Sequence, residues 1–334
     1  MSESLMRMEA RQTPDRIEKQ LSANTTRLTE IHAQIAAFAP LSVMIIGRGS
    51  SDHAGVYAKY LIETELGLPV ASAAPSVCTL FGRALKLQKT LVICISQSGR
   101  SPDILKQLEL AKTSGALCLA IVNDEDSPLA NLAQLVLPLH AGKERAVAAT
   151  KSYLCTLSAI IALVATWSQS QDLLKGLSKL PQCMRQTIQG SAQLLSQQLS
   201  QVSHCMVLGR GFGYAISREI ALKFKEVCGI HAEAYSSAEF LHGPVTLVAQ
   251  KMVLINVEIE DETSSAHQAH VEEVKSQGGE VINLISSNAS HDLHPRLQAL
   301  LVMQRFYLDI EAIALSFGFN PDAPVGLRKV TKTL

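Results

Sequence analysis

A serine-rich loop carries the residue types best suited to bind a phosphate group. The segment Ser96-Gln-Ser-Gly-Arg-Ser-Pro-Asp103 follows an apolar run and opens a helical pattern, with Ser101 as the expected N-cap and Pro102 at the first helical position. Unpaired backbone N–H groups at a helix start attract anions, and the hydroxyls, the Gln97 amide and the Arg100 charge add further donors. We expect a phosphate cradle without the lysine of a P-loop, although an ordinary capped loop would explain the same residues.

Three residues on one predicted helix face have the types needed for acid–base chemistry. Glu219, Lys223 and Glu226 recur at i, i+4 and i+7 within a helical pattern over residues 215–227. Most such faces are solvated and bridged by ion pairs, which is the simpler interpretation. Glu226, however, lies one turn from the helix end that Gly229 is expected to mark, where the helix dipole opposes further negative charge. A carboxylate in that position suits a general base.

Histidines offer a titratable ring and possible metal ligands. His242 stands in a rigid His-Gly-Pro turn, where a lone histidine is more often structural than catalytic. Two further pairs have i, i+3 spacing: His267 with His270, and His291 with His294. No carboxylate or thiol is spaced to complete a ligand set with them, so we expect no metal.

Two glycine-rich turns follow apolar runs, and we compare them with the glycine fingerprint of dinucleotide-binding sites. Gly47-Arg-Gly49 and Gly209-Arg-Gly211 both lack the third glycine of the fingerprint, because Asp52 and Tyr214 stand there. The glycines are explained as tight strand-to-helix turns. We therefore expect no nicotinamide cofactor, and no cofactor of any kind.

The two turns belong to an internal repeat. Their numbers differ by 162 (209 − 47), and the same offset places Gly67 on Gly229. Residues 112–116 resemble residues 275–279 at an offset of 163. Three landmarks in register indicate two homologous halves in tandem.

Each half predicts strands that alternate with helices. In the first half we expect strands at 43–46, 90–95 and 117–122, and helices at 54–65 and 102–114. In the second half we expect strands at 206–208, 252–257 and 280–284, and helices at 215–227 and 264–277. This order predicts an α/β fold in which each half is a doubly wound α/β/α sandwich around a parallel sheet. Ligands bind such sheets at the carboxyl ends of the strands, where the loops described above lie.

The remaining segments complete a predicted domain plan. We expect an N-terminal helical segment at 1–24, a first domain at 25–170, a helical connector at 171–195, a second domain at 196–319 and a C-terminal tail at 320–334. The apolar stretch 154–167 is about 14 residues long, too short to span a bilayer, and predicts a buried helix.

Composition excludes several classes of protein. The length of 334 residues suggests about two domains, and 30 basic residues balance 30 acidic ones. A balanced charge and an aromatic content of 4% argue against a nucleic-acid binder. Zero net charge favours self-association. Seven cysteines without a CxxC pair, together with a polar N-terminus, indicate free thiols in a cytoplasmic protein that does not bind membranes.

Taken together, these segments resemble the tandem sugar isomerase (SIS) domain family, as in the isomerase half of glucosamine–fructose-6-phosphate aminotransferase. The resemblance covers about residues 25–334 and implies two tandem SIS subdomains. Its motifs occur in order: Gly49-Ser-Ser51, Ser96-Gln-Ser-Gly99, Val147-Ala-Ala-Thr-Lys151, Leu222-Lys-Phe-Lys-Glu226, His231-Ala-Glu-Ala-Tyr235, Glu239-Phe-Leu-His-Gly-Pro244 and Leu327-Arg-Lys-Val-Thr331.

The resemblance implies a role for individual positions. Those matching the residues that hold the sugar phosphate are Ser51, Ser96, Gln97, Ser98 and Ser101, and those matching the sugar-lining positions are Val147 and Ala149.

Four further positions match residues of the reaction itself. Glu226 matches the base that moves a proton between C1 and C2, and Lys223 matches a helix lysine near the reacting carbons. Lys329 matches a tail lysine that reaches the open-chain sugar. His242 matches the ring-opening histidine, which the neighbouring subunit supplies in the family, so a homodimer is implied.

Departures from the aminotransferase pattern point to a deaminase. Ser2 stands where the glutaminase domain has its cysteine, and that domain is not seen in this sequence. Arg100-Ser101 replaces the usual Glu-Thr, and Ala149 replaces a serine. The resemblance therefore implies conversion of glucosamine 6-phosphate and water to fructose 6-phosphate and ammonia. Alternatives are a deglycase of 6-phosphorylated fructosamine adducts, a simple aldose–ketose isomerase and a non-catalytic sugar-phosphate sensor.

Overall fold

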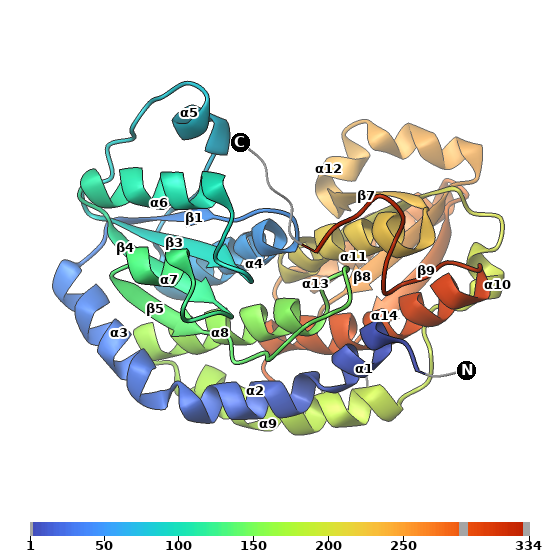
Figure 1. Ribbon diagram of the computed structural model, residues 1–334. Helices are drawn as coiled ribbons and strands as arrows, with labels where there is room; N and C mark the ends of the chain where they lie inside the picture. Colours follow the sequence, from blue (N-terminus) through green and yellow to red (C-terminus); the bar gives the residue numbers. More distant parts are fainter. Residues whose placement is uncertain (1–2, 287–292, 330–334) are drawn as a thin grey trace. The chain divides into compact units, whose positions relative to one another are not determined.

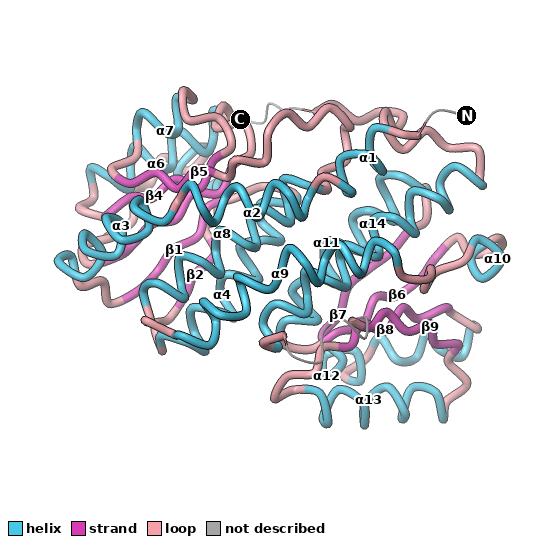
Figure 2. The backbone as a smooth tube through the Cα atoms, turned by 90° about the horizontal axis from the view of Figure 1, so that it is seen from below, coloured by secondary structure: helices cyan, strands magenta, loops and turns pink. Residues whose placement is uncertain are grey.

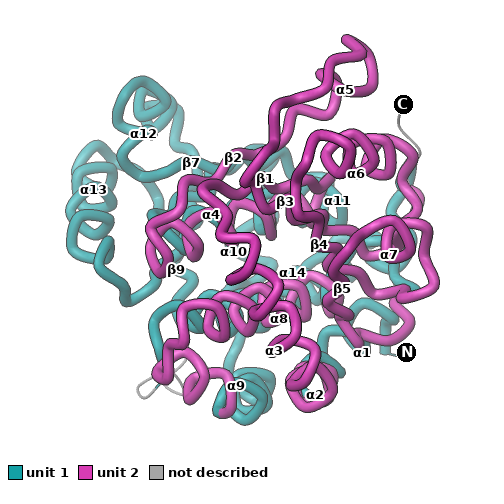
Figure 3. Tube along the Cα trace, turned by 90° about the vertical axis from the view of Figure 1, so that its left-hand side faces the viewer, with its two compact units in different colours: residues 1–14, 145–150, 179–327 teal, residues 15–144, 151–178, 328–334 magenta. Residues whose placement is uncertain are grey.

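The computed structural model describes residues 3–286 and 293–329, and its contacts divide it into two compact units (Figure 3). Unit 1 comprises the described parts of residues 1–14, 145–150 and 179–327. Unit 2 comprises the described parts of residues 15–144, 151–178 and 328–334. The segment 145–150, which contains Val147 and Ala149, thus belongs to unit 1 although both of its neighbours in sequence belong to unit 2.

Unit 2 is built on a five-stranded parallel sheet of order β2-β1-β3-β4-β5. The strands are β1 (Ser42–Ile46), β2 (Val70–Ser72), β3 (Thr90–Ser96), β4 (Leu117–Val122) and β5 (Leu135–Pro138). Every residue of β3 and β4 is buried, as expected for central strands that are covered on both faces.

Helices cover both faces of this sheet (Figure 1). The helices α3 (Thr25–Phe38), α4 (Ser50–Leu66) and α8 (Lys151–Trp167) cover one face, and α6 (Pro102–Thr113) and α7 (Pro128–Leu132) cover the other (Figure 2). The short α5 (Pro75–Thr79) and most of helix α2 (Thr13–Ala23) complete the unit. Helix α8 is buried along almost its whole length, which confirms the prediction from its apolar sequence.

Unit 1 contains a four-stranded parallel sheet of order β7-β6-β8-β9. The strands are β6 (His204–Gly209), β7 (His231–Ser236), β8 (Val253–Glu258) and β9 (Glu280–Ile285). Its helices are α1 (Leu5–Arg11), α10 (Ser196–Leu199), α11 (Phe212–Cys228), α12 (Ser237–Leu241), α13 (Ser264–Ser276) and α14 (Pro295–Ser316), with a 3₁₀ helix η1 (Pro244–Gln250). Helix α9 (Gln171–Gln189) contributes residues to both units.

The backbone confirms the internal repeat. Gly49 and Gly211 precede α4 and α11 with the same φ of 53°, and their ψ values are −128° and −123°. Gly67 and Gly229 end the same two helices in the left-handed conformation, at φ 66° and 63°. Glycine suits these positions because a Cβ disfavours positive φ.

Some elements were not predicted from the sequence. The strands β2, β5 and β7 and the long helix α14 are not among the predicted elements, although β7 contains the motif His231-Ala-Glu-Ala-Tyr235. Helix α4 begins at Ser50, four residues before the predicted start, because its first turn is polar and lacks apolar periodicity. All seven cysteines are free, as expected. Among the residues the structure describes, no helix is long and apolar enough to cross a membrane.

Candidate active site

The first candidate site lies where the chain reverses its direction of travel across the sheet of unit 2. From β1 the chain continues to β2 on one side, whereas from β3 it continues to β4 and β5 on the other. The connecting helices α4 and α6 therefore leave the sheet on opposite faces, and a crevice opens between the carboxyl ends of β1 and β3. Doubly wound sheets bind their ligands at this topological switch point.

A cavity of about 360 Å³ occupies this crevice. It brings together six of the predicted residues: Ser51, Ser96, Gln97, Ser98, Ser101 and Lys329. Arg48, Gly49, Ile95 and Ile104 complete the lining. The residues expected to bind phosphate thus line one cavity, although they are far apart in the sequence.

The cavity is rich in hydrogen-bond donors that the protein leaves unused. The N-termini of α4 and α6 both border it, so two helix dipoles favour an anion there. The side chains of Ser51, Gln97, Ser98 and Ser101 form no hydrogen bond with any described residue. Ser101 occupies the predicted N-cap of α6, but its hydroxyl makes no capping bond and remains available to a ligand.

The loop between β3 and α6 has little conformational freedom. The N–H of Gly99 donates to Oγ of Ser96 across 3.1 Å, and Gly99 has a φ of 61°. A Cβ built on Gly99 would lie 2.2 Å from Oγ of Ser127, so only glycine fits. The backbone around Gln97 and Ser98 is thereby held in one shape, as a preorganised anion site requires.

Lys329 reaches this cavity from the C-terminal tail and is held by a buried carboxylate. Its Nζ lies 2.8 Å from Oε2 of Glu144, whose side chain has no exposed surface. Ser152 donates to Glu144 from its N–H and its hydroxyl, across 3.0 and 2.7 Å. Burial by itself would raise the pKa of Glu144, but the Lys329 charge and these hydrogen bonds outweigh it and lower the pKa. Glu144 was not singled out from the sequence.

Two arginines near the cavity differ from expectation. Arg100, expected to add charge to the cradle, pairs with Asp124 at 2.6 Å and does not line the cavity. Arg48 does line it, and its Nε and Nη2 both lie 2.7 Å from Oδ2 of Asp103. The sequence offered no signal for this pair, because 55 residues separate its members.

The equivalent glycine turn in unit 1 is more crowded. A Cβ built on Gly49 meets nothing within 4 Å, whereas one on Gly211 would lie 3.1 Å from Thr263 and 3.3 Å from Asp261. The loop after β8 also contains Glu260, whose negative charge would repel a phosphate. The turn of the first half therefore offers an anion more room than the turn of the second.

The second candidate site lies on α11. Lys223 is 1% exposed and stands between two carboxylates: its Nζ lies 3.1 Å from Oε1 of Glu219 and donates a short hydrogen bond to Oε2 of Glu226. The hydroxyl of Tyr307, on α14, donates to Oε1 of Glu219 across 3.5 Å. The alternative interpretation, a solvated ion-pair face, is wrong, because α14 packs on α11 and buries it.

This arrangement keeps a fixed positive charge beside Glu226. Burial by itself would lower the pKa of Lys223, but the two carboxylates and their hydrogen bonds raise it. The side chain of Glu226 remains 20% exposed, so its carboxylate combines a buried cationic partner with access from outside. Access from outside is required of a general base, because it must reach the proton that it removes.

The remaining predicted residues lie elsewhere in unit 1. Val147 and Ala149 are half-buried, and the N–H of Val147 donates to the carbonyl of Asp322 across 3.0 Å. His242 is exposed and ends α12, and it lines neither cavity described here. These positions remain predictions from the resemblance.

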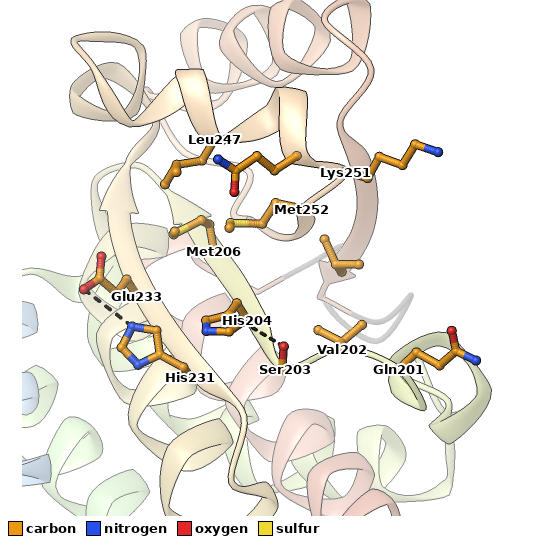
Figure 4. A pocket seen from close by; sticks show the side chains of 12 residues that line it. Gln201, Val202, Ser203, His204, Met206, His231, Glu233, Leu247, Lys251 and Met252 are labelled. Carbon is orange, nitrogen blue, oxygen red and sulfur yellow. Dashed lines mark hydrogen bonds and ion pairs between the residues drawn. The ribbon is translucent and has the colours of Figure 1, made fainter.

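A larger cavity, of about 550 Å³, lies in unit 1 at the amino ends of the strands (Figure 4). It borders the amino ends of β6, β7 and β8, and none of the predicted site residues lines it. Two pairs of its polar side chains contact each other: Ser203 with His204 across 2.7 Å, and His231 with Glu233 at 3.9 Å. Gln201, Gln250 and Lys251 also line it.

The histidine pairs do not assemble a metal site among the described residues, which contain no cluster of three potential ligands. His267 is buried, and burial lowers its pKa. His291 lies outside the described residues.

Comparisons with known proteins show the family to which the chain is similar. The SIS domain profile matches residues 39–166 and 198–293. A curated relative, the isomerizing glutamine–fructose-6-phosphate aminotransferase of Thermus thermophilus, is 30% identical over 311 residues, which cover 86% of this chain and 51% of the relative. The chain thus spans about half the length of such relatives.

Solved structures show the same fold. A protein from Silicibacter pomeroyi, provisionally assigned as a phosphosugar isomerase, superposes with a TM-score of 0.89 at 33% identity, over 96% of this chain and 100% of that one. Glucosamine-6-phosphate deaminase from Thermotoga maritima has a TM-score of 0.73 at 21% identity, over 95% and 100%. With its repeated α/β halves and its profile match over most of the sequence, the chain belongs to the SIS domain family.

Proposed function

We propose that this protein is a phosphosugar aldose–ketose isomerase that deaminates glucosamine 6-phosphate to fructose 6-phosphate and ammonia. One observation carries the proposal: the cavity of unit 2 gathers the expected sugar-phosphate residues at a switch point, with unused donors and two helix N-termini. Such a site recognises a phosphate monoester rather than a neutral sugar.

The choice of deamination rests on the relatives and on particular residues. The curated relative is named for an isomerizing amino transfer to fructose 6-phosphate, which joins nitrogen chemistry to isomerisation. This chain has Ser101 and Ala149 where the aminotransferase pattern has threonine and serine. These substitutions resemble the deaminases of the family, in which the sugar loses its nitrogen as ammonia.

The first step opens the sugar ring. In the proposed mechanism His242 of a second subunit moves a proton from the C1 hydroxyl to the ring oxygen, which breaks the C1–O bond and leaves an aldehyde at C1. The exposed position of His242 at the end of α12 is compatible with delivery to another subunit. The phosphate, bound in the cavity, holds the open chain in place.

The second step transfers a proton between neighbouring carbons. The C2 proton is acidic because the C1 carbonyl withdraws electrons, and Glu226 removes it and returns a proton to C1. The C1 oxygen gains a proton and the nitrogen loses one, which leaves a hydroxyl at C1 and an imine at C2. Lys223, charged and in contact with Glu226, or Lys329, which lines the phosphate cavity, stabilises the negative charge that develops on O1.

The last step releases ammonia. Water adds to the C2 imine, the C2–N bond breaks, and the products are fructose 6-phosphate and ammonia. Overall, one water is consumed for each ammonia formed. The reaction needs no redox partner, because the oxidation of C2 is balanced by the reduction of C1.

Product analysis tests the proposal. Purified protein is incubated with glucosamine 6-phosphate, and ammonia and fructose 6-phosphate are measured by separate coupled assays. Equal amounts of both products are expected. Turnover of a 6-phosphorylated fructosamine adduct alone would replace deamination by deglycation, and sugar interconversion without ammonia would indicate a simple isomerase. Saturable binding without any turnover would indicate a sensor.

A further inference from the structure

Arg48 brings positive charge to a cavity whose lining serines and glutamine are neutral donors. Serine hydroxyls and the Gln97 amide line the cavity, and the other lining cation, Lys329, is already paired with buried Glu144. A phosphate monoester is a dianion near neutral pH, because its second pKa is about 6. Charge-assisted hydrogen bonds to such an anion are roughly twice as strong as neutral ones.

A buried carboxylate fixes the orientation of Arg48. Nε and Nη2 both contact Oδ2 of Asp103, whose side chain is fully buried in the first turn of α6. The Arg48 side chain is 47% exposed and has no other hydrogen-bond or ion-pair partner among the described residues. Nη1 is thus left for a ligand, on a guanidinium that Asp103 prevents from rotating away.

The repeat argues against a purely structural role for this pair. Arg210 is the counterpart of Arg48 at the 162-residue offset, and Ser265 is the counterpart of Asp103. Arg210 forms no ion pair with any described residue, yet Gly211 beside it has the same backbone conformation as Gly49. The glycine turn therefore does not need the Arg48–Asp103 bridge. Among the described residues, the bridge occurs in the half that contains the phosphate cavity and has no counterpart in the other half.

We propose that Arg48 is the charged residue that binds the phosphate dianion of the sugar substrate, and that Asp103 is its positioning residue. The identity of the sugar in this assignment rests on the proposed function. The binding of a phosphate group does not.

Binding measurements on the full chain test the assignment. Fructose 6-phosphate and inorganic phosphate are titrated by calorimetry into wild type and Arg48→Met. Arg48→Met is expected to bind fructose 6-phosphate about 10- to 100-fold more weakly, the effect of losing a charged hydrogen bond. Arg100→Met removes a matched arginine from the exposed pair with Asp124 on the same unit, and should change the affinity less than about twofold.

A pH series separates binding from a structural role. Wild-type affinity for fructose 6-phosphate should weaken as the pH falls from about 7.5 to about 5.5, because the phosphate loses its second charge near its pKa of about 6. Arg48→Met should show a flatter dependence, whereas a merely structural role would leave the slope unchanged. Arg48→Lys, which keeps a charge, should recover part of the affinity and of the slope. Asp103→Asn should weaken binding less than Arg48→Met.

The outcomes distinguish this assignment from the proposed reaction. Fructose 6-phosphate binding by Arg48→Met within about twofold of wild type would overturn the assignment and leave the cradle standing. An Arg48-dependent affinity without ammonia release would support the assignment and refute deamination. Failure of the wild-type protein to bind either anion would overturn both.

Discussion

The ammonium group of Lys329 lies 2.8 Å from Oε2 of Glu144, a carboxylate with no exposed surface. Residue 329 thereby belongs with the cavity of unit 2, although most of the preceding C-terminal chain belongs to unit 1. Because Ser152 already donates twice to Glu144, the carboxylate is fixed and the flexible lysine must come to it. Glu144 therefore positions Lys329 at the phosphate cavity.

Replacing Glu144 by Gln should release this lysine. The amide can still accept from Ser152, but its NH₂ group would face the ammonium and repel it. We expect kcat/KM for glucosamine 6-phosphate to fall at least about tenfold, as for loss of one charged hydrogen bond. Limited proteolysis should cut the tail near Arg328 faster in this variant.

A double-mutant cycle checks that Glu144 acts through Lys329. In a Lys329→Met background, Glu144→Gln should reduce kcat/KM by less than about twofold further, because the shared contact is already gone. Losses that multiply in the double variant would show that Glu144 has a separate role.

The proposed contribution of His242 across a subunit interface can be tested with mixed dimers. His242→Ala and Glu226→Gln chains are co-expressed with different tags, and the heterodimer is purified. In a two-fold dimer, one site then contains both defects and the other contains none, so about half of the wild-type activity should return. A Lys223→Met and Glu226→Gln heterodimer is the matched control, because both residues lie on α11 of one chain. It should remain inactive. Equal activities of the two heterodimers would refute the shared site.

Acid stability should report on the bridge between Glu262 and Arg296. The guanidinium binds both carboxylate oxygens at 2.6 and 2.8 Å, and this hydrogen bonding lowers the pKa of Glu262 from 4.5 to about 2. A depressed pKa contributes stability above the unfolded value and loses it as the pH falls toward about 2. Because Glu262 is 75% exposed, the contribution is about 1 kcal/mol or less.

Denaturant unfolding of wild type and Glu262→Gln measures this contribution. The stability difference should be greatest near pH 7 and should shrink as the pH falls from 4.5 toward about 2. Glu272→Gln, which removes an exposed helix pair with Lys275, is the control. A difference between wild type and Glu262→Gln that persists unchanged at about pH 3 would contradict the assigned cause.

The sequence predicted the fold well because its signals were local or repeated. The turns at Gly49 and Gly211 need a backbone conformation that favours glycine. The constant spacing of such turns indicated the tandem repeat. The predicted central strands were apolar throughout because parallel sheets are buried on both faces. Short edge strands such as β2 and β5 were missed, since a few residues make no periodic pattern.

The sequence predicted the site less completely. Motif resemblance supplied Ser51, Ser96 and Lys329, which the structure brings to one cavity. Arg48 and Glu144 were not predicted as site residues. Their partners lie 55 and 185 residues away in the sequence, so no local pattern indicates the pairing. The burial of the ion pairs on α11 could not be predicted from the sequence either. It depends on contact with α14, a helix that no motif predicts.

The most direct test of the proposed chemistry is Glu226→Gln. The substituted amide would keep the shape of the side chain but could not accept the C2 proton, so ammonia release from glucosamine 6-phosphate should fall by about 10²- to 10⁴-fold. Fructose 6-phosphate should still bind within about threefold of wild type, because the phosphate cavity is unchanged. Near-normal turnover by the variant would contradict the assignment of Glu226 as the base, and with it the proposed mechanism.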